Sequence, residues 1–120
     1  MNSENKKLVG DRGEDIAADF IKQNGFEIIK RNYRFGHGEI DIIAKQKDVL
    51  VFIEVKTRKN LEFGPPELAV TKSKQRQIRK ISEAYLVDNK IVDVDCRIDV
   101  IAILIKKNLP PEINHIENAF

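Results

Sequence analysis

Two acidic residues and a lysine in the middle of the chain have types and a spacing that suit chemistry on phosphate esters. Asp41 lies in an alternating stretch, residues 39–45, and Glu54 and Lys56 lie two residues apart in the apolar stretch 49–57. Both stretches favour β-strands, in which residues two apart point to the same face. Carboxylates next to an ammonium group can bind a divalent cation and a phosphate oxygen together.

The short polar connection between the two stretches decides which side chains meet. A two-residue loop there would place Asp41 opposite Glu54, and Glu39 opposite Lys56. Two carboxylates that face each other destabilise a sheet unless something offsets their repulsion, and Mg²⁺ or Mn²⁺ would do so. The alternative is an ordinary cross-strand ion pair between Glu39 and Lys56 on a solvated face. Within the stretch 39–45, alternation predicts two faces. Ile40, Ile42 and Ala44 would lie on one, and Glu39, Asp41 and Ile43 on the other.

Hydrophobic periodicity predicts the elements that position these residues. A helix is expected over residues 8–24, and Gly25 would end it. A second helix is expected over residues 71–88, with Thr71 or Ser73 as candidate N-caps. Strands are expected in the remaining apolar segments: 26–34, 39–45, 49–57, 97–106 and 113–117. This order predicts an α/β fold, a mixed sheet of about five strands flanked by helices, with a parallel crossover through the second helix.

Length and composition limit the class of protein. The chain has 120 residues, 42% hydrophobic and 33% charged, which fits one domain over residues 1–120 with a buried core. The N-terminal stretch is polar, and no segment reaches the roughly 20 apolar residues that a membrane span needs. Cys96 is the sole cysteine, so we expect no internal disulfide, a small buried thiol and a cytoplasmic location. The net charge of +2 says little about partners by itself.

The two acidic stretches resemble a known signature. Glu39–Ala44 followed by Val51–Arg58 resembles the PD-(D/E)XK nuclease signature and, more narrowly, the bacterial YraN family of predicted endonuclease-fold proteins. The likeness extends over nearly the whole chain, through the short segments Gly13-Glu14, Arg31–Arg34, Arg97–Val100 and Asn118–Phe120. It implies a restriction-endonuclease-like fold, similar to that of archaeal Holliday-junction resolvases, in a single nuclease-like domain.

The resemblance also implies a role for each site residue. Asp41 matches the first metal-binding aspartate, and Glu54 and Lys56 match the acidic residue and the lysine of the (D/E)XK pair. Glu14 matches the helix glutamate that closes the metal site in resolvase-like members. The implied catalytic set is therefore Asp41, Glu54, Lys56 and Glu14, with the three carboxylates holding Mg²⁺ or Mn²⁺. Without the resemblance, Glu14 reads as a surface residue favoured by the helix dipole.

Basic residues flank the proposed face and could neutralise the phosphates of a nucleic acid. The candidates are Arg31, Arg34, Arg58, Lys72, Arg76 and Arg79. The alternative for the helical members is an ordinary solvated helix face. No aromatic stacking platform accompanies them, so backbone recognition is expected rather than base reading. Residues 60–68 leave the strand soon after Lys56 and are a candidate mobile lid.

Three functions from different classes fit these features. The first is a Mg²⁺-dependent endonuclease that hydrolyses phosphodiester bonds in DNA, with branched or damaged DNA as candidate substrates. The second is a nucleic-acid-binding module that keeps the fold without cutting. The third is an interaction protein that forms a homodimer through a sheet edge or its C-terminal strand. The intact set of Asp41, Glu54 and Lys56 favours the first, because a pure binder does not need opposed carboxylates.

Three polar residues outside this set have simpler interpretations. Asp99 lies in an apolar strand, where an acid is costly unless it is paired, so a bond to Arg97 or to a helix terminus is expected, with support of the site as the alternative. His37 and His115 are isolated in the sequence and are expected to be loop or surface histidines.

Overall fold

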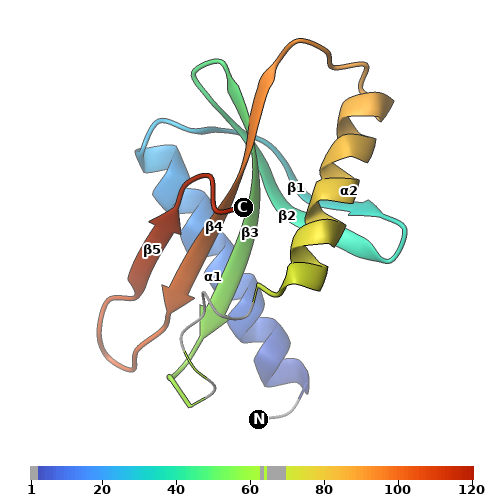
Figure 1. The fold of residues 1–120 in the computed structure, drawn as a ribbon. Coiled ribbons are helices and arrows are strands. Elements are labelled where there is room, and N and C mark those ends of the chain that lie inside the picture. Colours follow the sequence, from blue (N-terminus) through green and yellow to red (C-terminus); the bar gives the residue numbers. More distant parts are fainter. Residues whose placement is uncertain (1–2, 63, 65–69) are drawn as a thin grey trace.

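The computed structural model describes residues 3–62, 64 and 70–120, with side chains from residue 8 onward. The elements run in the order α1 (Ser3–Gln23), β1 (Glu27–Phe35), β2 (Gly38–Gln46), β3 (Val49–Arg58), α2 (Lys72–Asp88), β4 (Asp95–Leu104) and β5 (Glu112–Ile116). The sheet lies between the two helices, with α1 behind it and α2 in front of it in Figure 1. The expected mixed α/β sheet of five strands flanked by helices is therefore confirmed. Most of the candidate lid, residues 63 and 65–69, falls outside the described residues.

The strands pair in chain order, β1-β2-β3-β4-β5. The β3–β4 pair is parallel, because α2 connects these strands as the expected crossover, and the other pairs are antiparallel. Strands β3 and β4 lie at the centre and are buried on both faces, which explains their nearly continuous apolar runs. The predicted hairpin register is confirmed near the turn, since Ile43 pairs with Phe52, but the ladder ends before the expected pairs of Asp41 with Glu54 and of Glu39 with Lys56. Among the described residues, no helix is long and apolar enough to cross a membrane.

Helix α1 begins at Ser3, five residues before the expected start. The later start was expected because the glycines of this segment weaken a helix. Packing of α1 on the sheet through its apolar face, which includes Ala17 and Ile21, outweighs this effect. Its end is as predicted: Gly25 has a φ of 88°, and the Phe26 N–H donates to the Ile21 carbonyl at 2.9 Å. This is a Schellman end, in which glycine accepts the left-handed backbone.

The strict alternation predicted for β2 is wrong at Asp41. Ile40 packs with Ile43 in the core under α2, whereas Ile42 packs in the core under α1. On the adjacent strand β1, Asn32 lies at the same level and has a φ of 55°, a left-handed conformation that interrupts the pleat. The sheet is therefore irregular at Asp41, which is the residue on which the proposed chemistry depends.

Candidate active site

The Asp41 carboxylate lies where β2 and β3 stop pairing. The antiparallel ladder between these strands ends at the pair formed by Ile42 and Ile53. Beyond that pair, the Val55 N–H donates to the Asp41 Oδ2 atom at 2.7 Å. The side chain thus takes over a backbone donor of β3, and this bond holds Asp41 beside Glu54, the residue that precedes Val55.

The environment of Asp41 opposes its negative charge. Burial first, and then repulsion by Glu54, together raise the pKa of Asp41 to about 8, against the lowering effect of the Val55 N–H. Glu14 and Glu39 are close enough to add smaller increases. In the absence of a cation, Asp41 is therefore largely protonated at neutral pH. A cation at this point would favour the ionised carboxylate.

The Glu54 side chain is buried between two lysines. Its Oε1 atom lies 3.3 Å from Lys56 Nζ and 3.7 Å from Lys74 Nζ. Its Oε2 atom is buried and has no hydrogen-bond partner among the described residues. Lys74 was not among the catalytic residues predicted from the sequence. It comes from the first turn of α2, which the Thr71 side chain caps by accepting from the Lys74 N–H at 3.2 Å. A parallel crossover brings a helix start back to the sheet, and this geometry is the signal that could have identified Lys74.

Glu14 approaches the same site from α1. It is partly buried, burial raises its pKa, and the positive charge of Arg31 opposes that rise. Its Oε1 atom is buried, and no group in the described part of the chain forms a hydrogen bond with it. The close approach depends on Gly13, because a Cβ atom at that position would lie 1.9 Å from Thr57 Oγ1. The site therefore receives a carboxylate from α1 in addition to those of β2 and β3, whereas α2 contributes Lys74.

The donor set fits a hard divalent cation, which prefers carboxylate oxygens and retains several waters. Glu54 and Glu14 both lie within electrostatic reach of Asp41, and each has a buried oxygen that no described group satisfies. Among the described residues, however, no group of three or more His, Cys, Asp or Glu side chains is placed to hold a metal ion. A cation could be held here only if these carboxylates moved closer together.

The expected alternative, an ion pair between Glu39 and Lys56, is not what the structure shows. Glu39 Oε2 lies 3.3 Å from Arg34 Nε on the neighbouring strand β1, and Lys56 pairs with Glu54 instead. Arg34 is a predicted nucleic-acid-binding residue, and its guanidinium is otherwise exposed. The lysine therefore remains next to the buried carboxylate, as a catalytic role would require.

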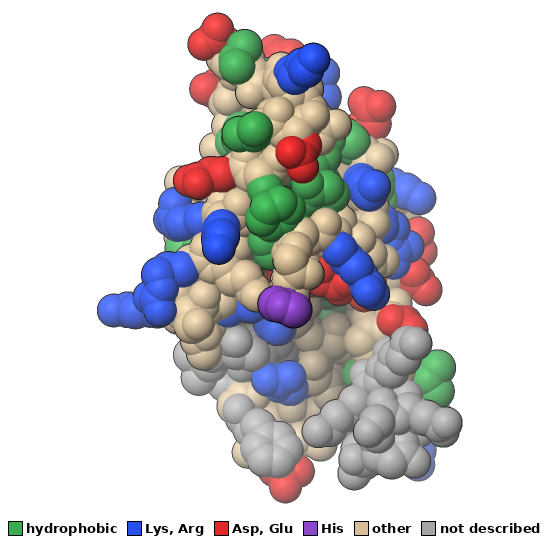
Figure 2. Space-filling model, turned by 90° about the vertical axis from the view of Figure 1, so that its right-hand side faces the viewer, with side chains coloured by type: hydrophobic (Ala, Val, Ile, Leu, Met, Phe, Trp, Pro, Cys, Tyr) green, Lys and Arg blue, Asp and Glu red, His purple; other side chains and the backbone are tan. Residues whose placement is uncertain are grey.

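The other predicted nucleic-acid-binding residues have different surroundings. Arg31 pairs with Asp15 at 2.9 Å, and Arg58 is partly buried and donates to the Thr57 carbonyl at 3.3 Å. The remaining three are exposed on α2: Lys72, Arg76 and Arg79. Figure 2 shows the corresponding concentration of Lys and Arg side chains along the left side of the view, over α2. These cations lie on the same helix as Lys74, so they flank the carboxylate site.

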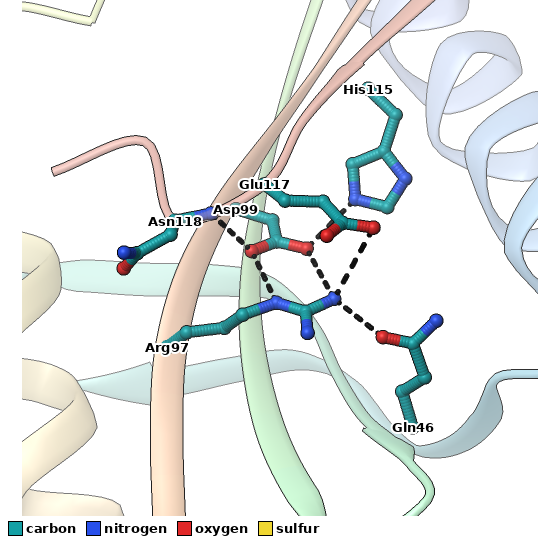
Figure 3. Close-up of polar contacts among 6 residues, drawn as sticks. All are labelled: Gln46, Arg97, Asp99, His115, Glu117 and Asn118. Carbon is teal, nitrogen blue, oxygen red and sulfur yellow. Dashed lines mark hydrogen bonds and ion pairs between the residues drawn. The ribbon is translucent and has the colours of Figure 1, made fainter.

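A second buried acid, Asp99, has a complete set of partners (Figure 3). Its oxygens lie 3.0 Å from Arg97 Nε, 2.8 Å from His115 Nε2 and 3.0 Å from the Asn118 nitrogen. Burial raises the pKa of Asp99, but these hydrogen bonds together hold it below its usual value. The expected bond to Arg97 is confirmed. Two expectations are wrong: His115 is partly buried and lies against Asp99, and Cys96 is exposed instead of lying in the core.

Fold and site together define a mixed α/β protein with a buried acidic site that both helical layers approach. Residues 13–103 match the profile described as "Uncharacterised protein family UPF0102", and the chain belongs to this family, which confirms the resemblance to YraN proteins. It is 53% identical over 114 residues to a UPF0102 protein of Geotalea daltonii, covering 95% of this chain and 90% of the relative. It is 48% identical over 118 residues to a relative from Geobacter sulfurreducens, covering 98% and 92%. A relative from Caldicellulosiruptor saccharolyticus is 43% identical over 117 residues, covering 97% and 99%.

Proposed function

We propose that the protein is a divalent-cation-dependent endonuclease of the PD-(D/E)XK type, which hydrolyses phosphodiester bonds in DNA. The observation that carries this proposal is the burial of Asp41 beside Glu54, with Lys56 Nζ 3.3 Å from Glu54 and a Glu54 oxygen left without a partner. Two repelling, incompletely satisfied carboxylates lower the stability of a fold. Such arrangements are concentrated at functional sites.

Each residue of the set has a distinct role in this proposal. Asp41, Glu54 and Glu14 would hold Mg²⁺ or Mn²⁺, which supplies an activated water and neutralises charge on the phosphate. Lys56 holds its ammonium group beside the carboxylates, where it stabilises the negative charge that develops on the phosphate. The Val55 N–H fixes the orientation of Asp41 through its hydrogen bond. The exposed cations of α2 would hold neighbouring backbone phosphates.

Calorimetric titration with Mn²⁺ tests the cation site directly. We expect the wild-type protein to bind Mn²⁺ and Glu54→Gln to bind it at least about tenfold more weakly, because one anionic ligand is lost. Glu83→Gln removes an exposed carboxylate from α2 and is the matched control. A wild-type protein that does not bind Mn²⁺, or that binds it as well after Glu54→Gln, would contradict the proposal.

Cleavage assays on linear, flapped and branched DNA test the reaction. Lys56→Ala should lower the cleavage rate by about 10²–10³-fold, since it removes a charge placed next to the reacting phosphate. Asp41→Asn should abolish metal-dependent cleavage. If the protein binds DNA in a salt-sensitive way but cleaves none of these substrates in Mg²⁺ or Mn²⁺, it would instead be a nucleic-acid-binding module that keeps the nuclease fold.

A further inference from the structure

A basic groove lies at the end of the sheet where β3 and β4 finish. Its volume is about 770 Å³. The lining residues come from α1, from the end of β3 and from the turn between β4 and β5: Arg12, Lys59, Ile105, Lys106, Lys107, Asn108, Leu109 and Pro110. None of these residues belongs to the carboxylate site. The groove is therefore a separate feature.

The charge of this groove is one-sided. Of the described residues that line it, four are basic and none is acidic, although the whole chain has 21 basic and 19 acidic residues. Within the described part of the chain, Lys106 pairs with Glu112, and no ion pair involves Arg12, Lys59 or Lys107. A concave surface lined by charges of one sign concentrates its electrostatic field. The groove should therefore attract a polyanion.

The rest of the lining suits a sugar-phosphate chain better than a lone ion. The Ile105 N–H donates to the Arg58 carbonyl at 2.8 Å, and this bond ties the end of β4 to the end of β3. The Leu109 side chain is 61% exposed beside Pro110 and provides an apolar wall. A sugar ring can lie against such a wall while its phosphates meet the lysines.

We propose that this groove binds neighbouring backbone phosphates of a nucleic acid, several nucleotides away from the cleaved bond. The choice of a nucleic acid as the source of the phosphate rests on the proposed function. Lys59 lies five residues after Glu54 along β3 and its end, which corresponds to about 17 Å. One strand of duplex DNA presents a phosphate for about every 3.4 Å of its axis. The groove would thus hold the strand about five phosphates from the carboxylates.

Fluorescence anisotropy of a labelled duplex DNA tests the groove without requiring turnover. The protein is titrated in EDTA over a series of salt concentrations, as the wild type and as Lys59→Gln/Lys107→Gln, in which both altered side chains are exposed. The matched control is Lys22→Gln/Lys45→Gln, which removes the same charge at exposed positions on the last turn of α1 and on β2. Thermal unfolding confirms that all variants are folded, and the single variant Lys107→Gln repeats the test with a smaller change.

The groove variant should bind DNA at least about tenfold more weakly, and the slope of log K against log salt should fall by nearly two, since about 0.9 is lost for each phosphate contact. The control variant should change neither quantity. Equal losses in both variants, or no loss in either, would overturn the proposal. A titration with inorganic phosphate identifies the other source: phosphate binding that depends on the two lysines, with DNA affinity unchanged, would also overturn it. DNA binding that depends on the groove, without any cleavage, would support phosphate binding in the groove and contradict the proposed nuclease activity. Cleavage that the groove substitutions leave unchanged would support the nuclease activity and contradict phosphate binding in the groove.

Discussion

Asp41 and Asp99 are both buried carboxylates in the same sheet, yet their surroundings have opposite effects. From the described residues Asp41 accepts a single hydrogen bond, which comes from a backbone N–H. It is buried beside another carboxylate, so its pKa rises to about 8. Asp99 is surrounded by a guanidinium, an imidazole nitrogen and a backbone N–H, which hold its pKa below the usual value despite complete burial.

The difference separates two uses of a buried acid. A carboxylate whose lone pairs are satisfied stabilises one arrangement of the chain around it, and Asp99 does this by joining β4 to β5 and the C-terminal segment. A carboxylate left with repulsion and few donors weakens the fold but is prepared for a positive ligand. Substitutions in the two regions should therefore have opposite consequences for stability.

The largest effect is expected from Asp99→Ala. It leaves Arg97 and His115 without their buried partner, and loss of one member of a buried charged set typically costs about 3–5 kcal/mol. Urea denaturation at neutral pH measures the change in the free energy of unfolding. Asp19→Ala, at an exposed position of α1, should change it by less than about 0.5 kcal/mol. A loss for Asp99→Ala as small as that of the control would remove the contrast between the two acids.

Asp41→Asn should act in the opposite direction. The pKa of Asp41 is raised from 3.8 to about 8, so its contribution to stability is complete below about pH 4 and is lost as the pH rises towards 8. Asparagine keeps an acceptor for the Val55 N–H and carries no charge. We expect a gain of about 2–3 kcal/mol in the metal-free protein near pH 8, allowing for relaxation around the ionised group, and almost none near pH 4.

Urea denaturation over this pH range checks the prediction, with the exposed turn substitution Asp48→Asn as the control. The pKa of Asp99 is shifted in the opposite direction, downwards. Its contribution to the stability of the fold is therefore present above pH 3.8 and is lost on further acidification. Stability of Asp41→Asn that follows the wild-type pH dependence would show that Asp41 is not the strained group.

A smaller effect is expected at two glycines of α1. Gly13 packs against β3 next to the site, whereas Gly10 faces open space. Gly13→Ala should cost about 1–3 kcal/mol, because the new methyl group would meet Thr57 Oγ1. Gly10→Ala meets nothing within 4 Å, and alanine favours helix, so it should stabilise by about 0.5–1 kcal/mol. Thermal unfolding of both variants measures the difference. Adding Thr57→Ala should recover part of the loss at Gly13, and no recovery would mean that the close approach is not its cause.

The smallest effect concerns the two lysines at Glu54. A double-mutant cycle between Lys74→Met and Glu54→Gln should give a coupling of about 0.5 kcal/mol, since this pair is separated by 3.7 Å and Lys74 is partly exposed. The corresponding cycle with Lys56, at 3.3 Å, should give a larger value. A larger coupling for Lys74 would move the principal cation of the site from β3 to α2.

The order of elements and the hairpin register could be predicted, because periodicity and turn length are local properties of the chain. The register alone was enough to bring Asp41 near Glu54. The irregularity of β2 could not be predicted, since alternation within one strand carries no information about its neighbour, where Asn32 has a left-handed backbone. For this reason Ile40 was assigned to the wrong face.

Contacts between distant segments were the other limit. Nothing in the local pattern connects His115 with Asp99, because their contact depends on β5 pairing beside β4. Glu14 entered the candidate site through family resemblance, and the close packing at Gly13 gives a physical reason for its position. The expectation that Cys96 is buried was wrong because a small apolar residue at the start of a buried strand can still lie outside the core.

The end of the β2–β3 ladder at Ile42 and Ile53 has a consequence for cooperativity. A ligand held there by Glu14 of α1 and by Glu54, which contacts Lys74 of α2, would touch the two outer layers at once. Its binding energy would then oppose the separate opening of either helix. Amide hydrogen exchange in α1 and α2 would slow together on binding, so that two layers packed on opposite faces of the sheet would open as a single unit.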